Sequence, residues 1–371
     1  MKRYDDCLTF NEAKHVGVQP AFLSTLFNVS GIQKGLSVKS RVSAHHFAGT
    51  LIGNLLEANM FQRNLAISIS SPSPTPLIKK RLLEGLSNLG IIKEIRKGYS
   101  FKTTELNIPK HDLTKIVSHD KVFEVFDPTS IIPSKAWSVV IRKDKEEIRV
   151  KESTEDHSTM YRCAVSFQRQ VNVPIRNFKR IFNGDMNSGG RVYSNYQQMS
   201  KDKRSLIRIG GEETIELDYR YNQIRMIFAL SKCKDEGDPY EGFELERDVV
   251  KKAINTMINA PHPKKVFCDM RYSAPFRWQS NEADNFTKAV YERYPILEKL
   301  QGSGVGLKLQ KLEGDIALEI MKHSLYNKTV ALPIHDSFIV KKSEESKFLV
   351  LMEEIWDKVV VSTKNSDFCG V

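Results

Sequence analysis

The stretch TIELDY, Thr214–Tyr219, decides how the second half of the chain is expected to fold. Ile215 and Leu217 alternate with acidic residues, and this period of two is typical of a half-buried β-strand. The pattern that follows predicts a helix over Asn222–Ser231. Asp218 therefore ends the strand just before the chain turns into a helix, where its carboxylate is aimed at whatever lies above the sheet.

A second aspartate lies in the stretch ALPIHDSFIV, residues 331–340. Two short apolar runs flank His335-Asp336-Ser337, and the simplest structure for this pattern is a tight hairpin with Asp336 at its turn. Aspartate is common at turns because its side chain bonds nearby backbone groups, so either aspartate alone is explained by local structure. If the two strands are neighbours, however, Asp218 and Asp336 converge.

Two converging carboxylates are the ligand set that a pair of Mg²⁺ ions requires. Mg²⁺ is a hard cation that prefers oxygen ligands, and in two-metal sites the ions lie about 3.5–4 Å apart. In such a site one ion activates an attacking hydroxyl and the other stabilises the leaving oxygen. The sequence thus predicts Asp218 and Asp336 as catalytic ligands of Mg²⁺, with Mn²⁺ as an alternative ion.

The surroundings of both aspartates resemble motifs of the family A DNA polymerases. The run ELDYRYNQIR, residues 216–225, is similar to motif A, in which a hydrophobic strand leads into Asp-Tyr and a stretch ending in Gln-Ile-Glu-Leu-Arg. The run IHDSFIV, residues 334–340, is similar to motif C. That motif reads His-Asp-Glu in the DNA polymerases and His-Asp-Ser in the related single-subunit, phage-type RNA polymerases. The resemblance implies that His335 is catalytic beside the primer 3′ end and that Arg225 supports the palm.

Three more segments follow the order of the same family, and the resemblance covers about residues 183–353. They are Gly189-Gly190-Arg191 with Asn195, Gln197, Gln198 and Arg204 downstream, the Arg247-x-x-x-Lys251 spacing of motif B, and Gln310 with Asp315-Ile316, where Lys311 replaces the family's glycine. Each piece is short, but all five appear in the family's order. The resemblance implies that Arg191, Gln197 and Gln310 contact the primer and template.

The motif B segment has the pattern of an amphipathic helix. Four polar residues repeat every four positions and form one stripe, namely Arg247, Lys251, Asn255 and Asn259. An apolar face lies beside it, formed by Val250, Ile254, Met257 and Ile258. A cationic stripe can bind an incoming nucleoside triphosphate, with Lys251 the first candidate and Arg247 the second. The alternative is a solvated charged face, but the motifs around the two aspartates favour nucleotide binding.

Departures from the family bear on which nucleotide is used. Asn255 and Asn259 stand where the family has an aromatic residue and a tyrosine near the end of motif B, and asparagine stacks poorly on a base pair. Gln223 stands where the DNA polymerases have the glutamate that blocks a ribose 2′-hydroxyl. Because glutamine is similar in size, Gln223 favours deoxynucleotides, whereas Ser337 favours ribonucleotides. Together these residues favour DNA synthesis.

A helix and a hairpin are predicted after the low-complexity stretch Ser68–Pro76. Thr75 is the expected N-cap, and apolar residues then recur at helical spacing up to Gly90. A hairpin is expected next, with strands Ile91–Arg96 and Tyr99–Thr104 joined by a turn at Lys97-Gly98. This order resembles the second half of a winged-helix module. Its basic side chains would contact phosphates, namely Lys79, Lys80, Arg81, Lys93, Arg96, Lys97 and Lys102. The alternative is the solvated surface of a small structural domain.

Composition narrows the possible partners and surroundings. The 371 residues carry a formal net charge of +11, which suits a polyanionic partner such as nucleic acid. The five cysteines are scattered without a Cys-x-x-Cys pair, which argues against a disulfide framework or a zinc ribbon and for a reducing compartment. No run approaches the roughly eighteen apolar residues that cross a membrane. We therefore expect a cytoplasmic protein without a membrane partner.

These observations predict an α+β protein with three parts. Residues 1–115 are expected to form a winged-helix-like nucleic-acid-binding domain and residues 116–180 a connector or thumb-like region. Residues 181–371 are expected to form a right-hand polymerase palm with an antiparallel sheet and short fingers. The expected activity is template-directed nucleotidyl transfer by a family A-like DNA polymerase without a proofreading exonuclease. Its partners would be a DNA template and primer and nucleoside triphosphates.

Three alternatives stay open on sequence grounds. A primase or single-subunit RNA polymerase would use the same palm with ribonucleotides. A non-catalytic DNA-binding replication initiator would rest on the winged helix, but both metal-binding aspartates are present, which argues against a decayed palm. A two-metal nuclease would need further clustered acids, and the sequence shows no such cluster with convincing spacing.

Overall fold

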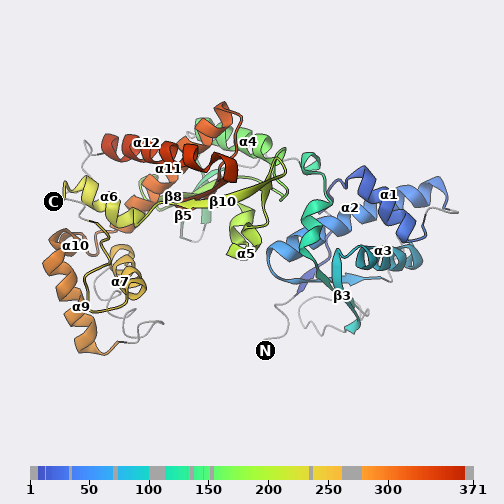
Figure 1. Cartoon of the computed structure of the whole chain (residues 1–371), viewed down its shortest axis with the longest axis horizontal. Helices are drawn as coiled ribbons and strands as arrows, with labels where there is room; N and C mark the ends of the chain where they lie inside the picture. The colour runs from blue at the N-terminus through green and yellow to red at the C-terminus, as the bar shows by residue number, and fades with distance from the viewer. Residues whose placement is uncertain are drawn as a thin grey trace. The chain divides into compact units, whose positions relative to one another are not determined.

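The computed structural model divides the chain into two compact units, each built from separate segments (Figure 1). The structure describes residues 7–12, 14–32, 36–69, 74–99, 113–131, 133, 138–144, 146–150, 154–233, 237–260 and 278–363. The first unit comprises Met1–Lys135, Ala164–Asn177 and Ser194–Ile215. The second comprises Ala136–Cys163, Phe178–Tyr193 and Glu216–Val371. Both mix helices with antiparallel or mixed sheets, which is compatible with the α+β prediction.

The first unit is built around a four-stranded sheet of order β1-β2-β4-β3. Strand β1 (Cys7–Thr9) is parallel to β2 (Asn64–Ser68), and β4 (Leu113–Ser118) is antiparallel to both β2 and β3 (Ile92–Tyr99). The helices beside the sheet are α1 (Pro20–Val29), α2 (Val38–Met60) and α3 (Pro76–Asn88). Helix α2 packs on β2 and β4, and α3 packs on α1 and β3, so the core lies between the sheet and these helices.

The helix predicted after the low-complexity loop is confirmed. Helix α3 begins at Pro76 behind Thr75, and the chain leaves it through Leu89 and Gly90. Gly90 has a φ of 75°, a left-handed conformation that glycine adopts without a steric penalty. The helix therefore begins and ends where the sequence predicts, although the Thr75 side chain makes no capping hydrogen bond.

The turn predicted at Lys97-Gly98 is wrong. Strand β3 continues through both residues to Tyr99 and pairs with β4, which lies later in the chain than the predicted second strand. A register shift between Arg96 and Tyr99 accommodates the glycine inside the strand, as a bulge does. Residues 100–112, which include most of the predicted second strand, lie outside the described residues.

Lys79 does not lie on the solvent side of α3, contrary to the prediction for a phosphate-binding face. Its side chain is 2% exposed, and its ammonium lies 5.4 Å from the centre of the Phe47 ring. Burial lowers the pKa of Lys79. Lys80 and Arg81, the next two residues, are exposed as predicted, and so is Lys93. The side chains of Arg96, Lys97 and Lys102 lie outside what the structure describes.

The second unit contains two groups of strands, and the first has the order β6-β5-β7-β8. Strand β5 (Val139–Lys143) is antiparallel to β6 (Glu146–Arg149) and parallel to β7 (Lys179–Asn183), which is antiparallel to β8 (Gly189–Tyr193). Helix α4 (Thr154–Gln168) connects β6 to β7, and its last residues belong to the first unit. Strand β6 is exposed along its whole length.

The second group of strands carries both aspartates. Strands β11 (Leu332–Ile334) and β12 (Ser337–Lys341) form the predicted hairpin, with His335-Asp336 as its two-residue turn. Strand β12 neighbours β10 (Glu212–Asp218), the strand predicted from TIELDY. The first residues of β10 belong to the first unit, where they pair with β9 (Arg208–Ile209). The predicted helix follows as α6 (Asn222–Leu230). The strand, hairpin and helix expected around the aspartates are confirmed.

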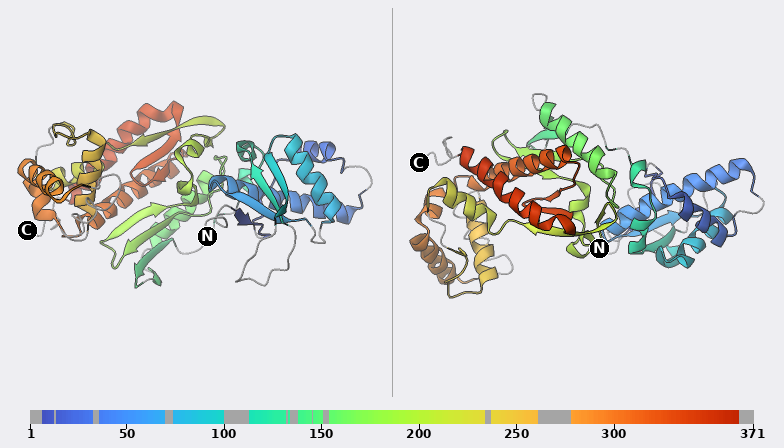
Figure 2. Two further views of the ribbon diagram at one scale, coloured as in Figure 1. Left: turned by 90° about the horizontal axis from the view of Figure 1, so that it is seen from below. Right: turned by 45° about the horizontal axis from the view of Figure 1, so that its top comes forward.

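Helices cover these strands. The helices that the structure describes in the second unit include α7 (Arg247–Asn259), α9 (Ser280–Arg293), α10 (Pro295–Leu300), α11 (Val305–Tyr326) and α12 (Glu345–Thr363). Helix α11 packs on β7 and β8, and α12 packs against α11, β12 and α6. Both views of Figure 2 show α11 and α12 together over the strands. Helix α10 packs on α7 and α9, and these three helices form a second group.

Helix α11 approaches β8 so closely that position 314 requires glycine. A Cβ on Gly314 would lie 2.0 Å from the carbonyl oxygen of Gly190. Gly190 has a φ of 85°, which residues with side chains rarely adopt, and its carbonyl oxygen also accepts a 2.8 Å hydrogen bond from Arg180 Nε. The approach brings the residues next to the two glycines, Arg191 and Glu313, face to face.

The two units divide the chain differently from the three predicted parts. Residues 116–180, predicted as a connector or thumb-like region, supply segments to both units. Residues 194–215, predicted as part of the palm, belong to the first unit. None of the helices that the structure describes is long and apolar enough to cross a membrane.

Candidate active site

Asp218 and Asp336 line one cavity of about 270 Å³ in the second unit. The sheet brings them together, because the backbone N–H of Tyr219 donates to the carbonyl oxygen of Asp336 at 3.4 Å. One aspartate enters from the end of β10 and the other from the β11–β12 turn, so the two share a cavity, as the sequence predicts. The other lining residues are Arg191, Tyr219, Tyr221, Asn222, Gln223, Tyr240, Lys251, Asn255, Asn259 and Glu313.

The hairpin turn fixes the position of Asp336. His335 adopts a left-handed conformation with φ 58°, which is uncommon for a residue with a side chain. The Ser337 hydroxyl donates to Glu216 Oε1 at 3.1 Å and ties the turn to β10. The His335 ring meets the Tyr193 ring edge-on, with 5.9 Å between their centres. His335, predicted to be catalytic, does not line the cavity and contributes to the turn beside it.

The chain reverses sharply between β10 and α6. Tyr221, at the N-cap of α6, has a φ of 38°, and such a conformation is strained for an aromatic residue. Tyr219 is buried, and its hydroxyl donates to the carbonyl oxygen of Met352 at 2.5 Å. The reversal is thereby anchored to α12 and leaves Asp218 at the open end of the strand. Strained backbone of this kind is common at functional sites, where the surrounding structure holds it in place.

The Asp218 carboxyl is harder to ionise than an ordinary aspartate. Its partial removal from bulk water at the cavity wall is the largest cause, and repulsion from Asp336 is the second; together they raise the pKa of Asp218 to about 6. The ammonium of Lys251 opposes this shift because it favours the carboxylate. A carboxylate destabilised by its neighbour is one whose charge a bound cation would compensate.

Helix α7 brings one cation and two amides to the cavity. Lys251, Asn255 and Asn259 lie at four-residue spacing and line it together, as the predicted stripe requires. The predicted apolar face is confirmed because its members are buried in the core, namely Val250, Ile254, Met257 and Ile258. The amphipathic pattern of the helix therefore determines which of its side chains face the aspartates.

Arg247, the first member of the predicted stripe, does not line the cavity. Its guanidinium forms a 2.6 Å ion pair with Asp238 and lies 5.5 Å from the centre of the Tyr240 ring. These contacts hold it at the beginning of α7. Of the two cations predicted to bind a triphosphate, Lys251 is the one that faces the aspartates.

A buried carboxylate that was not predicted joins two predicted site residues. Glu313 is 2% exposed and accepts hydrogen bonds from Arg191 Nε at 2.5 Å and from Gln223 Nε2 at 3.2 Å. Gln223 Oε1 in turn accepts from Asn259 Nδ2 at 2.7 Å. Burial raises the pKa of Glu313, and the Arg191 guanidinium opposes that rise. The four side chains form one hydrogen-bonded wall of the cavity.

One signal in the sequence could have identified Glu313. It lies on the inward side of α11 among Leu309, Leu312 and Ile316, which are all buried. A charged residue at an apolar position of a helical pattern breaks the local rule, and such breaks concentrate at functional sites. Tyr240, which also lines the cavity, lies in a segment whose sequence gives no comparable signal.

The other predicted nucleic-acid-binding residues of the polymerase motifs do not line the cavity. Gln310 is half-buried on α11, and Gln197, in the short helix η3 (Asn195–Gln198), belongs to the first unit. Arg225, expected to support the palm, forms a 2.6 Å ion pair with Glu353 and stacks 3.9 Å from the centre of the Trp356 ring. These contacts fix α6 to α12.

The donor set of the cavity fits a hard divalent cation. Mg²⁺ is commonly bound by one or two protein carboxylates, and water and substrate phosphates complete its shell. Asp218 and Asp336 supply two carboxylates that repel each other across one cavity. Within the described ranges, no group of three or more His, Cys, Asp or Glu residues could hold a metal ion. Asp218 and Asp336 are therefore the residues that could hold such a cation.

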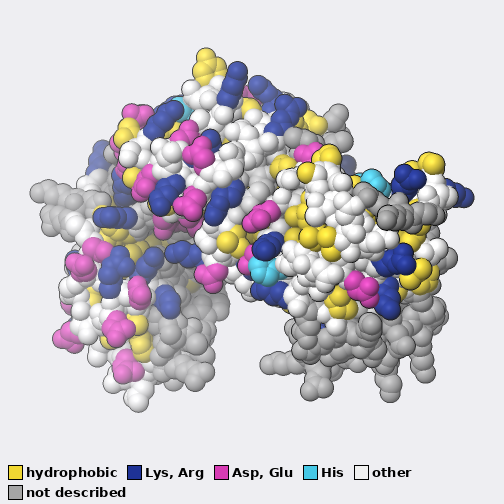
Figure 3. Space-filling model, turned by 45° about the vertical axis from the view of Figure 1, so that its right-hand side comes forward, with side chains coloured by type: hydrophobic (Ala, Val, Ile, Leu, Met, Phe, Trp, Pro, Cys, Tyr) yellow, Lys and Arg dark blue, Asp and Glu magenta, His cyan; other side chains and the backbone are white. Residues whose placement is uncertain are grey.

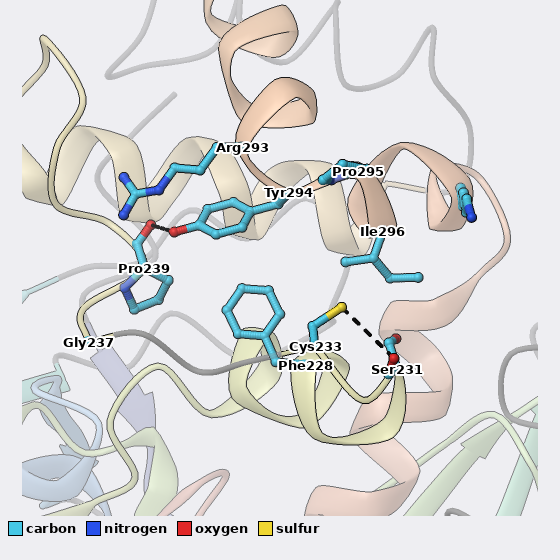
Figure 4. Close-up of a pocket in the computed structure, with 10 residues that line it drawn as sticks. Phe228, Ser231, Cys233, Gly237, Pro239, Arg293, Tyr294, Pro295 and Ile296 are labelled. Carbon is cyan, nitrogen blue, oxygen red and sulfur yellow. Dashed lines mark hydrogen bonds between the residues drawn. The ribbon is translucent and has the colours of Figure 1, made fainter.

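A larger cavity, of about 580 Å³, lies beside α6, α9 and α10 (Figure 4). Phe228 and Tyr294 contribute its aromatic wall, and the Tyr294 hydroxyl donates to the carbonyl oxygen of Pro239 at 3.0 Å. Arg293 and Lys299 are the cations among its described lining residues, which include no carboxylate or imidazole. The cavity with Asp218 and Asp336 is therefore the candidate active site, because carboxylates are among its lining residues.

Comparison of the sequence with protein-family models gives no match, and comparison with curated proteins gives none either. The geometry and chemistry of the cavity are therefore the basis for assigning a function.

Proposed function

We propose that this protein is a template-directed nucleotidyltransferase that extends a DNA primer with deoxynucleoside triphosphates. The observation that carries this proposal is the meeting of Asp218, Asp336 and Lys251 in one cavity. Two carboxylates that can bind metal and one cation that can bind a triphosphate are the groups that phosphoryl transfer to a hydroxyl needs. The resemblance to family A polymerases in motif order supports the same reaction.

The cavity residues would act mainly by positioning and by charge. Asp218 and Asp336 would hold Mg²⁺, which when bound supplies activation of the primer hydroxyl and stabilisation of the leaving oxygen. The Lys251 ammonium would bind the triphosphate and offset its negative charge. The primer 3′ hydroxyl would lose its proton to solvent, and its oxygen would form a bond to the α-phosphorus while the bond from that phosphorus to the bridging oxygen of the β-phosphate breaks. Pyrophosphate then leaves.

The elements around the cavity support the interpretation of the second unit as a polymerase palm with short fingers. The aspartates lie on β10 and on the antiparallel β11–β12 hairpin, as the metal ligands of a palm would. Helix α7, which carries Lys251, would act as the fingers helix, and α11 supports the cavity from the side of Glu313.

We further propose that the first unit binds the primer–template duplex as a winged-helix-like module. Its antiparallel strands β2, β4 and β3, with α3 packed on β3, support this interpretation. Lys80, Arg81 and Lys93 are exposed and would contact phosphates. On the face drawn in Figure 3, Lys and Arg side chains are spread among Asp and Glu side chains, so phosphate contacts there would be distributed rather than gathered in one patch.

Primer extension tests the proposed function. A labelled primer on a DNA template is incubated with Mg²⁺ and either deoxynucleotides or ribonucleotides, with a parallel reaction that lacks primer. We expect extension with deoxynucleotides and none without primer. Ribonucleotide products, above all without primer, would indicate a primase or RNA polymerase. No product in any reaction, together with tight duplex binding, would favour a non-catalytic DNA-binding protein.

A further inference from the structure

Both carboxylate oxygens of Glu313 are occupied. Oε2 accepts a hydrogen bond from Arg191 Nε at 2.5 Å and lies 2.5 Å from Arg191 Nη2 in the ion pair, and Oε1 accepts a hydrogen bond from Gln223 Nε2 at 3.2 Å. The Glu313 side chain is 0% exposed, whereas that of Arg191 is 22% exposed. A buried carboxylate destabilises a protein unless it is paired and hydrogen-bonded. The contacts with Arg191 and Gln223 offset that cost, and they hold both of these side chains in fixed positions.

The Gln223 amide has one hydrogen-bonding orientation in this wall. An amide nitrogen only donates and an amide oxygen only accepts. Gln223 Nε2 donates to Glu313, and Gln223 Oε1 accepts from Asn259 Nδ2 at 2.7 Å. If the amide turned over, its oxygen would face the carboxylate and its nitrogen would face the amide nitrogen of Asn259. Both contacts would then be repulsive, so the side chain is held in place from both ends.

We propose that Glu313 is a positioning residue for sugar selection, which holds Gln223 against the nucleotide cavity so that deoxyribose is accepted and a ribose 2′-hydroxyl is excluded. The inference rests on the proposed function, and it assigns the selectivity of that site to a side chain that needs no contact with the nucleotide. Glu313 acts through Gln223, whose amide would otherwise rotate away from an incoming ribose.

The Glu313–Arg191 pair also determines the charge of the cavity wall. Arg191 and Lys251 are the cations among the lining residues, and the carboxylate of Glu313 neutralises Arg191. If Glu313 lost its charge, the Arg191 guanidinium would add an uncompensated positive charge that attracts any triphosphate, whatever its sugar. Loss of Glu313 should therefore reduce selectivity without reducing the affinity for nucleotides.

The test compares the wild-type protein with Glu313→Gln, which keeps the shape of the side chain and removes its charge. The first readout is the ratio of kcat/KM for dATP to that for ATP in primer extension. The second is the affinity for each nucleotide by calorimetry, with Ca²⁺ in place of Mg²⁺ to prevent turnover. We expect the ratio to fall about tenfold or more, with kcat for dATP changed by less than about threefold, because a positioning residue alters selection before it alters chemistry.

A double-mutant cycle with Gln223→Ala shows whether Glu313 acts through Gln223. In the Gln223→Ala background, Glu313→Gln should change the ratio by less than about twofold, since the side chain it positions is gone. Asn259→Ala cuts the other tether of the same amide without touching the buried ion pair, and it should lower the ratio as well. This exposed residue keeps the proposal testable if Glu313→Gln fails to fold, and an unchanged ratio in Asn259→Ala would then overturn it.

Other outcomes also separate the two proposals. Three outcomes would overturn the role of Glu313 and leave nucleotidyl transfer standing. The first is an unchanged ratio in a folded Glu313→Gln protein, and the second is an enzyme in which Glu313→Gln lowers the ratio as much in the Gln223→Ala background as in the wild type. The third is a wild-type enzyme that uses both sugars equally. A wild-type protein that fails to extend primers but binds dATP more tightly than ATP, with the preference lost in Glu313→Gln, would overturn the proposed function and support this inference.

Discussion

The Asp218 side chain is the titratable group on which the candidate site depends most. Desolvation and the neighbouring Asp336 raise the pKa of Asp218 to about 6 in the metal-free protein. A carboxylic acid must lose its proton to bind a hard cation. Mg²⁺ affinity should therefore rise with pH through about 6 and level off above about 7. Calorimetric titration with Mg²⁺ across this range would reveal the midpoint, and a midpoint near 4 would show that Asp218 is not perturbed.

The same raised pKa predicts how Asp218 affects folding stability. A carboxyl whose pKa is higher in the folded than in the unfolded state binds more protons when folded, so stability falls as pH rises from about 4 to about 6 and stays low above that. Asp218→Asn removes this cost and should stabilise the protein at pH 7 by about 1 kcal/mol or less, because solvent screens an accessible charge. The Tm measured at pH 7 and at pH 4 checks this, with a larger gain expected at pH 7. Asp284→Asn, at an exposed position on α9, serves as the control and should show no such difference.

At the scale of single residues, the sequence predicts what each side chain can do better than where it lies. The sequence predicts Asp218 and Asp336 from their places at a strand end and a hairpin turn, and Lys251 from the polar stripe of its helix, each together with the motif resemblance. All three line the cavity. Lys79 was assigned to solvent because it is charged, yet helical spacing places it on the inward face of α3. Glu313 was missed because the residues that compensate its charge come from β8 and α6, far away in the sequence.

Helix α7 offers a direct comparison of two cations on one element. Lys251 lines the cavity, whereas Arg247 is held by Asp238 outside it. Lys251→Met should raise KM for the nucleotide about tenfold or more, since a cation facing the triphosphate is lost. Arg247→Met should raise it by less than about threefold, because an exposed ion pair contributes little. Steady-state kinetics of both variants checks this, and a larger effect at Arg247 would contradict the placement of the two cations.

A substitution at Gly314 in α11 tests whether the close approach of this helix to β8 holds the cavity wall together. A Cβ at position 314 would lie 2.0 Å from the Gly190 carbonyl oxygen, so Gly314→Ala forces the helix and strand apart. We expect a loss of about 1–3 kcal/mol in the free energy of unfolding, as overpacking of a core costs. Denaturant unfolding checks the value. Tyr326→Ala, at an 88% exposed position near the end of the same helix, is the control and should change stability by less than about 0.5 kcal/mol.

At the scale of elements, the sequence predicts regular helices and strands well and predicts poorly where a strand is interrupted. Period-two and helical patterns predicted β10, the β11–β12 hairpin, α3 and α7 at nearly their observed positions. The dipeptide Lys97-Gly98 has the composition of a turn, but the strand runs through it with a register shift. The strand continues through Lys97-Gly98 because it pairs with β4. Such pairing with a strand later in the chain cannot be recognised from the local sequence pattern.

At the scale of the whole molecule, substitutions of exposed and of buried basic residues in the first unit should differ in their effect on DNA affinity. The triple variant with Lys80→Glu, Arg81→Glu and Lys93→Glu should lower duplex affinity about tenfold or more at low salt and flatten the dependence on salt, since phosphate contacts are lost. Lys79→Met should leave the affinity unchanged because that side chain is buried. Fluorescence anisotropy with a labelled duplex checks both. Equal losses in the two proteins would argue against an interface on α3 and β3.

The division of the chain into two units was beyond prediction from sequence. Each unit collects three separate segments, and residues 164–177 and 194–215, which belong to the first unit, each lie between segments of the second unit. Composition and linker patterns identify boundaries only where one domain ends before the next begins. Here the chain passes between the units several times, and α4 and β10 each contribute residues to both.

The central claim is that Asp218 and Asp336 act together as the catalytic pair. The most direct measurement is the single-turnover rate of primer extension with Mg²⁺ for Asp218→Ala, Asp336→Ala, the double variant and Asp284→Ala as an exposed control. Each single aspartate variant should lose about a hundredfold or more in rate, and the double variant should be little worse than either, because the two groups work as a unit. The control should keep the wild-type rate. Full activity in both single variants would show that these carboxylates are not the catalytic pair.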